Sequence, residues 1–203
     1  MNNLIRSTTA FAMSIACRYI TDSGLIIDAT CGNGQDTLEL ALYDREHSLN
    51  ADIVAFDIQE TAIDNAKALL VSNGFGPQME TGQIRLVNRT HESMVDCVKE
   101  LFGESRKACL VIFNLGYLPG GDKSITTTAA STLTAVESAL RLLDTDGLVC
   151  ITMYSGHSEG AKEKQALLHF AKELDSHEYH VSYISMINQP NCPPEILLIS
   201  RKS

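Results

Sequence analysis

Short apolar runs alternate along the chain with longer stretches in which apolar residues recur every three or four positions. The runs are typical of buried strands, and the periodic stretches are typical of helices with one buried face. Strands are predicted over residues 24–29, 51–58, 83–88, 108–114, 147–154, 180–188 and 195–201. Helices are predicted between them over residues 36–45, 62–70, 93–102, 124–143 and 160–174.

Regular alternation of strand and helix predicts a doubly wound α/β fold, with a parallel sheet and helices on both faces. The last two strands are the exception, because residues 189–194 are too few to hold a crossover helix. These two strands should therefore be antiparallel. Five strand–helix units that end in such a hairpin resemble the class I methyltransferase fold. That Rossmann-like, seven-stranded sheet has the order 3-2-1-4-5-7-6, with strand 7 antiparallel.

The N-terminal segment, residues 1–22, carries apolar and small residues at helical spacing: Leu4, Thr8, Phe11, Ile15 and Tyr19. This pattern favours an amphipathic helix packed on the domain. A secretion signal is the weaker reading, because the apolar stretch is short and contains Thr and Ser. At 203 residues the chain is expected to form a single domain over 1–203.

Composition excludes several classes of protein. No apolar run approaches the ~20 residues of a membrane span. The six cysteines form no CxxC pair, so buried free thiols in a reducing cytoplasm are expected, with no metal site. A formal net charge of −9 argues against indiscriminate binding to nucleic acid, although it leaves room for a local basic patch.

The turn after the first strand is the first candidate for ligand binding, because α/β sheets bind ligands beyond the carboxyl ends of their strands. Two glycines there let the backbone approach a ligand and begin a helix. The third glycine of a dinucleotide-binding turn is replaced by Thr37, and carboxylates suit a cationic ligand better than a pyrophosphate. S-adenosylmethionine (SAM) is therefore favoured over NAD. The expected contacts are Asp28, Thr30, Gly32, Asn33, Gly34, Gln35, Asp36 and Thr37.

The next two strands also end in polar residues. Asp57, followed by Ile58 and Gln59, is placed to accept hydrogen bonds from both ribose hydroxyls, although it could instead cap the helix that follows. After the third strand, His91 or Glu92 could contact the adenine, or could serve only as helix caps. The residues alone do not separate these two roles.

The fourth strand ends in the stretch FNLGYLPGGDK, residues 113–123. Asn114, Leu115, Gly116 and Tyr117 have the spacing of the N-P-P-Y signature of amino methyltransferases. An amine must aim its lone pair at the methyl carbon, so acceptors must hold its hydrogens. The side-chain oxygen of Asn114 and the Leu115 carbonyl would serve, while the Tyr117 ring stacks on a base. The alternative is a turn that Asn114 caps, with Tyr117 packed in a groove.

Further polar residues follow on the same edge of the sheet. Tyr154 and His157 come after the fifth strand, close to Lys162 and Lys164, and a proline-rich loop over 188–194 joins the last two strands.

A substrate amine is largely protonated at neutral pH, and proximity to a sulfonium should lower its pKa. Water or a nearby side chain would take its proton, and the sequence does not require a strong base.

Together the motifs DATCGNGQDT, AFDIQ, HES, FNLGYLPGGDKSITT, YSGHSEGAKEK and NQPNCPP resemble a bacterial family of small methyltransferases long labelled rRNA methylases. The resemblance runs from about Gly24 to the C-terminus. It implies SAM-dependent methylation of the aminomethyl group of 5-aminomethyl-2-thiouridine at the tRNA wobble position, with the anticodon stem-loop as partner. The implied substrate contacts are Asn114, Leu115, Gly116, Tyr117, Leu118, Pro119, Lys123, Tyr154 and His157.

Other functions stay open at this point. The substrate could be an rRNA base or a small-molecule amine, and the net charge favours the latter. A nicotinamide oxidoreductase or a SAM-binding module without catalysis could use the same fold. The sequence does not determine the oligomeric state, and a homodimer is one of the assemblies it allows.

Overall fold

The computed structural model describes residues 5, 7–116, 127–156 and 158–203. Its centre is a seven-stranded sheet in the order β3-β2-β1-β4-β5-β7-β6. The strands β1 to β5 are parallel, whereas β7 is antiparallel to both β5 and β6. The strands are β1 Leu25–Asp28, β2 Asp52–Phe56, β3 Ile84–Val87, β4 Ala108–Asn114, β5 Leu143–Met153, β6 Tyr179–Ile184 and β7 Glu195–Arg201. The predicted class I methyltransferase topology is confirmed.

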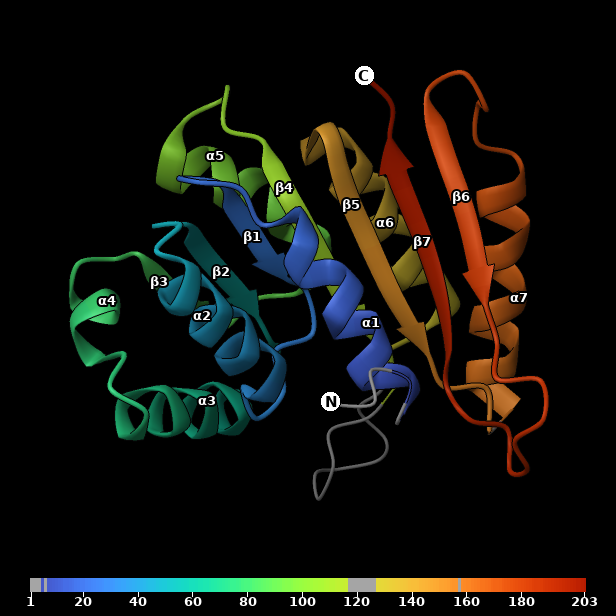
Figure 1. Cartoon of the computed structure of the whole chain (residues 1–203), viewed down its shortest axis with the longest axis horizontal. Helices are drawn as coiled ribbons and strands as arrows, with labels where there is room; N and C mark the ends of the chain where they lie inside the picture. The colour runs from blue at the N-terminus through green and yellow to red at the C-terminus, as the bar shows by residue number, and fades with distance from the viewer. Residues whose placement is uncertain (1–4, 6, 117–126, 157) are drawn as a thin grey trace.

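Helices cover both faces of the sheet, with α1 in front of its centre and α6 behind β5 in Figure 1. The helices are α1 Thr8–Ala16, α2 Gln35–His47, α3 Glu60–Ser72, α4 Gly76–Glu80, α5 Met94–Phe102, α6 Ala129–Leu142 and α7 Ser158–Lys172. Two short 3-10 helices cover Cys17–Tyr19 and His91–Ser93. None of the helices in the described ranges has the length and apolar character of a membrane span.

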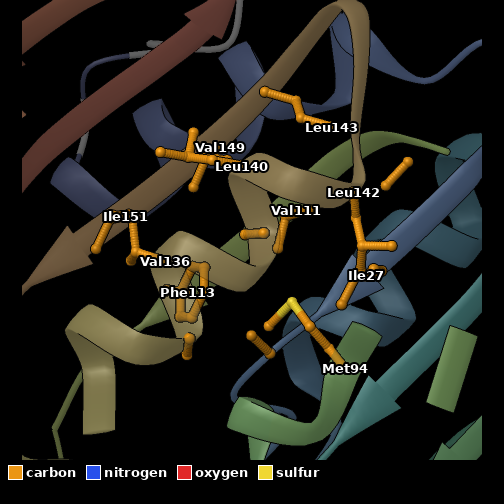
Figure 2. Close-up of a cluster of buried hydrophobic side chains, with 14 of the residues drawn as sticks. Ile27, Met94, Val111, Phe113, Val136, Leu140, Leu142, Leu143, Val149 and Ile151 are labelled. Atoms are coloured by element: carbon orange, nitrogen blue, oxygen red, sulfur yellow. The ribbon is translucent and has the colours of Figure 1, made fainter. Parts of the chain in front are cut away.

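Burial on both faces explains why the central strands are continuous apolar runs. Along β1, Leu25 and Ile27 pack toward α5, α6 and α7, whereas Ile26 packs toward α1 and α2. Figure 2 shows the first of these two layers, in which Phe113 and Ile151 of the sheet meet Val136 of α6. The edge strand β6 is different, because most of its residues are exposed.

The N-terminal helix α1 packs on the sheet mainly through Thr8, Ala12, Met13 and Ala16. Of the residues expected on its buried face, Phe11, Ile15 and Tyr19 are only partly buried, and Leu4 lies outside the described residues. It begins at Thr8, where Ser7 accepts a hydrogen bond from the Ala10 N–H and so caps the helix. Ala12 and Met13 are buried, and the Sγ of Cys150 on β5 lies 3.9 Å from the Ala12 carbonyl. The N-terminal helix therefore backs the middle of the sheet, close to the end of β4.

Several boundaries differ from the sequence-based expectation. The helix expected over 124–143 begins at Ala129, where Thr128 and Ser131 form a reciprocal capping box; residues 124–126 lie outside the described part of the chain. β5 begins at Leu143 rather than 147, because Leu143 pairs with Ala108 across a shift in register. The short helix α4 was not expected, since Gly76 and Pro77 are typical of a turn; the proline lies in its first turn, where no N–H is needed.

Candidate active site

Asp28 ends β1 and braces the loop that follows it. Its two carboxylate oxygens accept hydrogen bonds from the Thr30 N–H at 3.1 Å and from the Thr37 hydroxyl at 2.6 Å. Complete burial, followed by the nearby negative charge of Asp36, raises the pKa of Asp28 to about 7. Asp28 and Thr37 thus hold the loop against the start of α2.

The two glycines of this loop have different reasons to be glycine. Gly32 has a φ of +52°, and its N–H donates to the carboxylate of Asp57 at 2.9 Å. Gly34 has a φ of +84°, and a Cβ placed on it would lie 2.7 Å from the Cβ of Ala66 on α3. Gly34 is therefore required by the packing of the loop on α3 as well as by its left-handed backbone.

Asp57 lies directly after β2 and connects two loops. Its second oxygen accepts the Gln59 N–H at 2.8 Å, so both oxygens are bonded to backbone donors. The next residue, Ile58, leaves 58% of its surface exposed. A carboxylate with an exposed apolar side chain beside it suits a ligand that has both hydroxyl groups and a flat apolar ring.

A cavity of about 1020 Å³ opens at the carboxyl ends of the parallel strands. Most of the predicted cofactor contacts line it, namely Thr30, Gly32, Asn33, Gln35, Asp36, Asp57, Ile58, Gln59, His91, Glu92, Asn114 and Leu115. Of the predicted substrate contacts, Leu115, Gly116 and Tyr154 line it as well. Asp28, Gly34 and Thr37 are absent from this lining: Asp28 and Thr37 are fully buried, and Gly34 packs against Ala66 of α3. Tyr117, Leu118, Pro119, Lys123 and His157 lie outside the described residues.

Some lining residues were not foreseen from the sequence. They are Ala29, Cys31, Phe56, Arg89, Thr90, Thr127, Ser131, Gly156 and Cys192. Thr127 and Ser131 could have been suspected, because they flank the N-terminus of a long helix at the edge where ligands bind. Cys192 comes from the loop between β6 and β7, which the sequence places at the same edge without indicating which of its residues reaches the cavity.

Asn114 is the polar end of β4, and its side chain is oriented by Asp36. Its Nδ2 donates to the Oδ2 of Asp36 at 3.1 Å, while its backbone N–H donates to the Thr30 hydroxyl at 2.6 Å. Its side-chain oxygen is buried and has no hydrogen-bond partner in the described structure. Since a buried acceptor without a donor is costly, this oxygen is available for a ligand that can donate.

The backbone after Asn114 is held from behind. The Leu115 N–H donates to the Thr152 carbonyl at 2.9 Å, and the Gly116 N–H donates to the Thr127 hydroxyl at 3.2 Å. The Thr127 hydroxyl in turn donates to the buried carboxylate of Glu163 at 3.1 Å. The segment that enters residues 117–126 therefore starts from a fixed position.

Two ring side chains face this region. His91 lies 3.1 Å from the Ala29 carbonyl through Nδ1 and meets the Phe113 ring edge-on at 5.9 Å between centroids. Burial lowers the pKa of His91, so the ring is neutral near pH 7. Burial, followed by the charge of Asp36, raises the pKa of Tyr154, which therefore stays a phenol.

Two of the lysines expected near the substrate side, Lys162 and Lys164, are already paired. Lys162 lies 2.7 Å from Glu159, and Lys164 forms an ion pair with Glu195. Glu195 also accepts hydrogen bonds from Tyr183 and from Ser185, the latter at 3.0 Å. These contacts tie α7 to the hairpin of β6 and β7, a role that no sequence motif indicated.

Comparison with known proteins assigns this arrangement to a family. Residues 53–200 match the family described as "Putative rRNA methylase". The chain is also 32% identical over 200 residues to a chloroplastic tRNA (mnm5s2U34)-methyltransferase of Arabidopsis thaliana, covering 98% of this chain and 71% of that protein. The chain belongs to this rRNA methylase family. The resemblance seen in the motifs is confirmed.

Solved structures of relatives superpose on almost the whole of this chain. A "putative rRNA-methylase" of Clostridium thermocellum superposes with a TM-score of 0.83 at 32% identity, covering 97% of this chain and 98% of that one. A "putative methyltransferase" of Streptococcus mutans, in complex with SAH, gives a TM-score of 0.79 at 30% identity and the same coverage. The predicted class of enzyme, a SAM-dependent methyltransferase, is confirmed, and SAM is its cofactor.

Proposed function

We propose that this enzyme transfers the methyl group of SAM to the aminomethyl nitrogen of 5-aminomethyl-(2-thio)uridine at the wobble position of tRNA. The observation that carries the proposal is the side-chain oxygen of Asn114, a buried acceptor without a partner in the described structure, on a residue that lines the cavity. An amine nucleophile needs such an acceptor to hold its hydrogens while its lone pair faces the methyl carbon. The Arabidopsis thaliana relative is named for the same class of wobble nucleoside.

The cavity extends from the loop after β2 to the loop after β5, so SAM and a nucleoside can occupy different ends of it. Its volume of about 1020 Å³ lies at the upper end of the ~300–1,000 Å³ of sites for a single drug-sized molecule. Asp57 and Ile58 lie at its β2 side and would hold the ribose and adenine of SAM. Asn114 and Tyr154 lie on the β4 and β5 side, where a flipped-out nucleoside would enter. The predicted contacts at Tyr117, Leu118, Pro119, Lys123 and His157 belong to this substrate side of the proposal.

The experiment is a methylation assay with defined substrates. Purified enzyme and SAM are incubated with tRNA whose wobble uridine carries the aminomethyl group, and the digested nucleosides are analysed by mass spectrometry. We expect one added methyl group on that nucleoside and none on tRNA that lacks the aminomethyl group. Absence of methylated wobble uridine with a protein that binds SAM would contradict the proposal.

A small-molecule amine is the second candidate substrate, because Lys162 and Lys164 are both paired with carboxylates and the net charge is −9. The same assay separates the two candidates when it includes the isolated anticodon stem-loop and the free nucleoside. Methylation of the stem-loop at the rate of whole tRNA supports the anticodon stem-loop as the partner. Equal methylation of the free nucleoside would favour the small-molecule reading, and methylation of rRNA instead would favour the reaction that the family description suggests.

The proposal also covers the cellular compartment and the oligomeric state of the enzyme. We place the enzyme in the cytoplasm, since all six of its cysteines are free thiols, as expected in a reducing compartment. We assign residues 1–203 to a single methyltransferase domain that works as a monomer or a homodimer. Light scattering with and without the anticodon stem-loop distinguishes these two states.

A further inference from the structure

The proposed reaction requires the substrate amine to lose one proton before it accepts the methyl group. An alkyl amine binds largely as an ammonium ion at neutral pH, since such groups have a pKa near ~10. An ammonium ion has no lone pair, so it must lose a proton before it can attack the methyl carbon of SAM. The positive sulfonium eases this loss but does not accept the proton. A base within reach of the amine would therefore speed the reaction.

Asp36 lies next to the side chain that is proposed to hold the amine. It comes from the first turn of α2, lines the large cavity, and bonds to Asn114 through Oδ2 at 3.1 Å. Its Oδ1 receives no hydrogen bond from any of the described residues, and none of the ion pairs among them includes Asp36. An amine bonded to the Asn114 amide would thus lie one hydrogen bond from Asp36, directly or through one water.

The surroundings of Asp36 favour a bound cation. The titratable groups that feel its charge are Asp28 on β1, Cys31 in the following loop, Cys150 on β5 and Tyr154 after it. Burial keeps the two thiols and the phenol neutral, and no cationic side chain among the described residues is paired with Asp36. On the far side, α1 contributes only uncharged residues, Thr9, Ala12, Met13 and Ala16, to a cavity of about 20 Å³ shared with Asp36 and Asn114. Burial raises the pKa of Asp36, because it removes the carboxylate from water, while the hydrogen bond from Asn114 opposes this shift.

Other groups in the described part of the site are less suited to accept the proton. Both oxygens of Asp57 are bonded to backbone N–H groups, and the oxygens of Glu163 accept the hydroxyls of Thr127 and Thr132. Asp28 does not line the cavity, and Tyr154 is a phenol. Asp36 is the carboxylate that combines a place in the cavity, a contact to Asn114 and an oxygen without a described partner.

We propose that Asp36 binds the substrate as its ammonium ion and takes the proton from the amine before methyl transfer; this inference rests on the proposed function. One N–H bond of the ammonium breaks, and the proton moves to a carboxylate oxygen of Asp36, leaving the electron pair on nitrogen. The neutral amine then forms the N–C bond as the S–C bond breaks, giving a methylated ammonium product and SAH. The proton on Asp36 leaves to water when the products depart.

The variant Asp36→Asn tests this role, because an asparagine still accepts a hydrogen bond from Asn114 but cannot take a proton. Single-turnover rates are measured with saturating SAM and aminomethylated tRNA from pH 6.5 to 9.5, and the SAM affinity is measured by calorimetry. At pH 7 we expect a loss of ~10²–10³-fold, as for other general bases. The loss should shrink to ~10-fold or less by pH 9.5, where much of the substrate amine is already neutral. A SAM affinity within ~3-fold of the parent, about 0.7 kcal/mol, is expected if Asp36 acts on the substrate rather than as the cofactor contact that the sequence suggested. A larger loss of SAM affinity with a parent-like single-turnover rate at saturating SAM would assign Asp36 to the cofactor and overturn its role as the base.

Asp44→Asn is the matched control. Asp44 is a buried carboxylate on the same helix, burial raises its pKa as well, and it accepts the Ala51 N–H at 2.8 Å away from the cavity. This variant should keep the parent rate at every pH. An Asp36→Asn loss that is the same at all pH values, or a parent-like rate at pH 7, would overturn the role of Asp36 while leaving the proposed function intact. A parent enzyme that methylates no aminomethylated substrate would overturn both.

Discussion

The carboxylate of Asp57 accepts the backbone N–H of Gly32 at 2.9 Å, which fixes the glycine turn after β1 to the loop after β2. Asp57 therefore has two tasks at once in this enzyme. It shapes the loop on which SAM is proposed to lie, and it lines the cavity on the side where the ribose is proposed to bind. A change at Asp57 should weaken the cofactor site without touching the substrate side.

Replacement of Asp57 by alanine should reduce SAM affinity by ~10-fold or more, since hydrogen bonds to a charged group contribute ~1.5–3 kcal/mol. Calorimetric titration with SAM measures this change. Asp64→Ala, at an exposed position on the following helix α3, is the control and should bind SAM like the parent. Parent-like affinity in Asp57→Ala would count against ribose binding at this residue.

Replacement of Asn114 by alanine should abolish methyl transfer while changing SAM affinity by no more than ~3-fold. The reason is that the side-chain amide is proposed to hold the amine, whereas the Asn114 backbone, bonded to Thr30, stays in place. A loss of ~10²-fold or more is expected from misplacing the nucleophile. Single-turnover methylation together with calorimetry gives both numbers, and retained turnover would refute the amine-holding role.

The stability of the SAM-free enzyme should depend on the protonation of Asp28. Its pKa rises from an ordinary value near 3.8 to about 7 in the folded state, so the folded protein binds this proton more tightly than the unfolded chain does. The stabilisation is complete below pH ~4 and is lost as the pH rises through 7, with a total on the order of 4 kcal/mol. Urea unfolding should show that the unfolding free energy of the parent falls relative to that of Asp28→Asn as the pH rises from 5 to 8. A constant difference would contradict this origin.

Glu195→Gln should destabilise the hairpin of β6 and β7. Burial alone would raise the pKa of Glu195, but hydrogen bonds from Lys164, Tyr183 and Ser185 outweigh it and lower the pKa. The stabilisation is therefore present above the unfolded pKa of ~4.3 and is lost as the pH falls through the folded value. We expect about 2–3 kcal/mol at pH 7 from losing these charged hydrogen bonds, with the variant and the parent converging in acid.

Urea unfolding at pH 7 and at pH 3.5 measures both parts of the Glu195 prediction. The exposed pair of Glu159 and Lys162 provides the comparison, and Glu159→Gln should cost less than ~1 kcal/mol. A Glu195→Gln variant as stable as Glu159→Gln would show that the buried network contributes little.

Most of the fold was predictable because burial on both faces makes the central strands unambiguous. The strand β4 was predicted with both of its ends, since its apolar run stops at Asn114. Strands whose ends depend on pairing with residues far away in the sequence were predicted less well. β5 starts early because Leu143 pairs with Ala108, and β6 ends at Ile184 rather than at 188. Local sequence does not contain these pairings.

The candidate site, like the fold, was predictable only where local sequence decides the arrangement. Motif spacing brought Asp36, Asp57 and Asn114 to one edge of the sheet, and the structure places all three around one cavity. The spacing of the motifs did not indicate in which direction each side chain points. Asp28 was expected to face the cofactor, yet its oxygens are bonded to Thr30 and Thr37. The contact between Asp36 and Asn114 joins residues 78 positions apart, so only the folded chain reveals it.

The close approach of Gly34 to Ala66 constrains a residue that never touches a ligand. A Cβ on Gly34 would stand 2.7 Å from the Cβ of Ala66, so no free space separates α3 from the loop at this point. Ala66 is also fully buried, so a larger side chain at position 66 would require its neighbours to move. In a scan of all substitutions, position 66 should tolerate replacement as poorly as the residues of the cavity wall. Proteins that keep this loop conformation should therefore also keep a small residue at position 66, in the middle of α3.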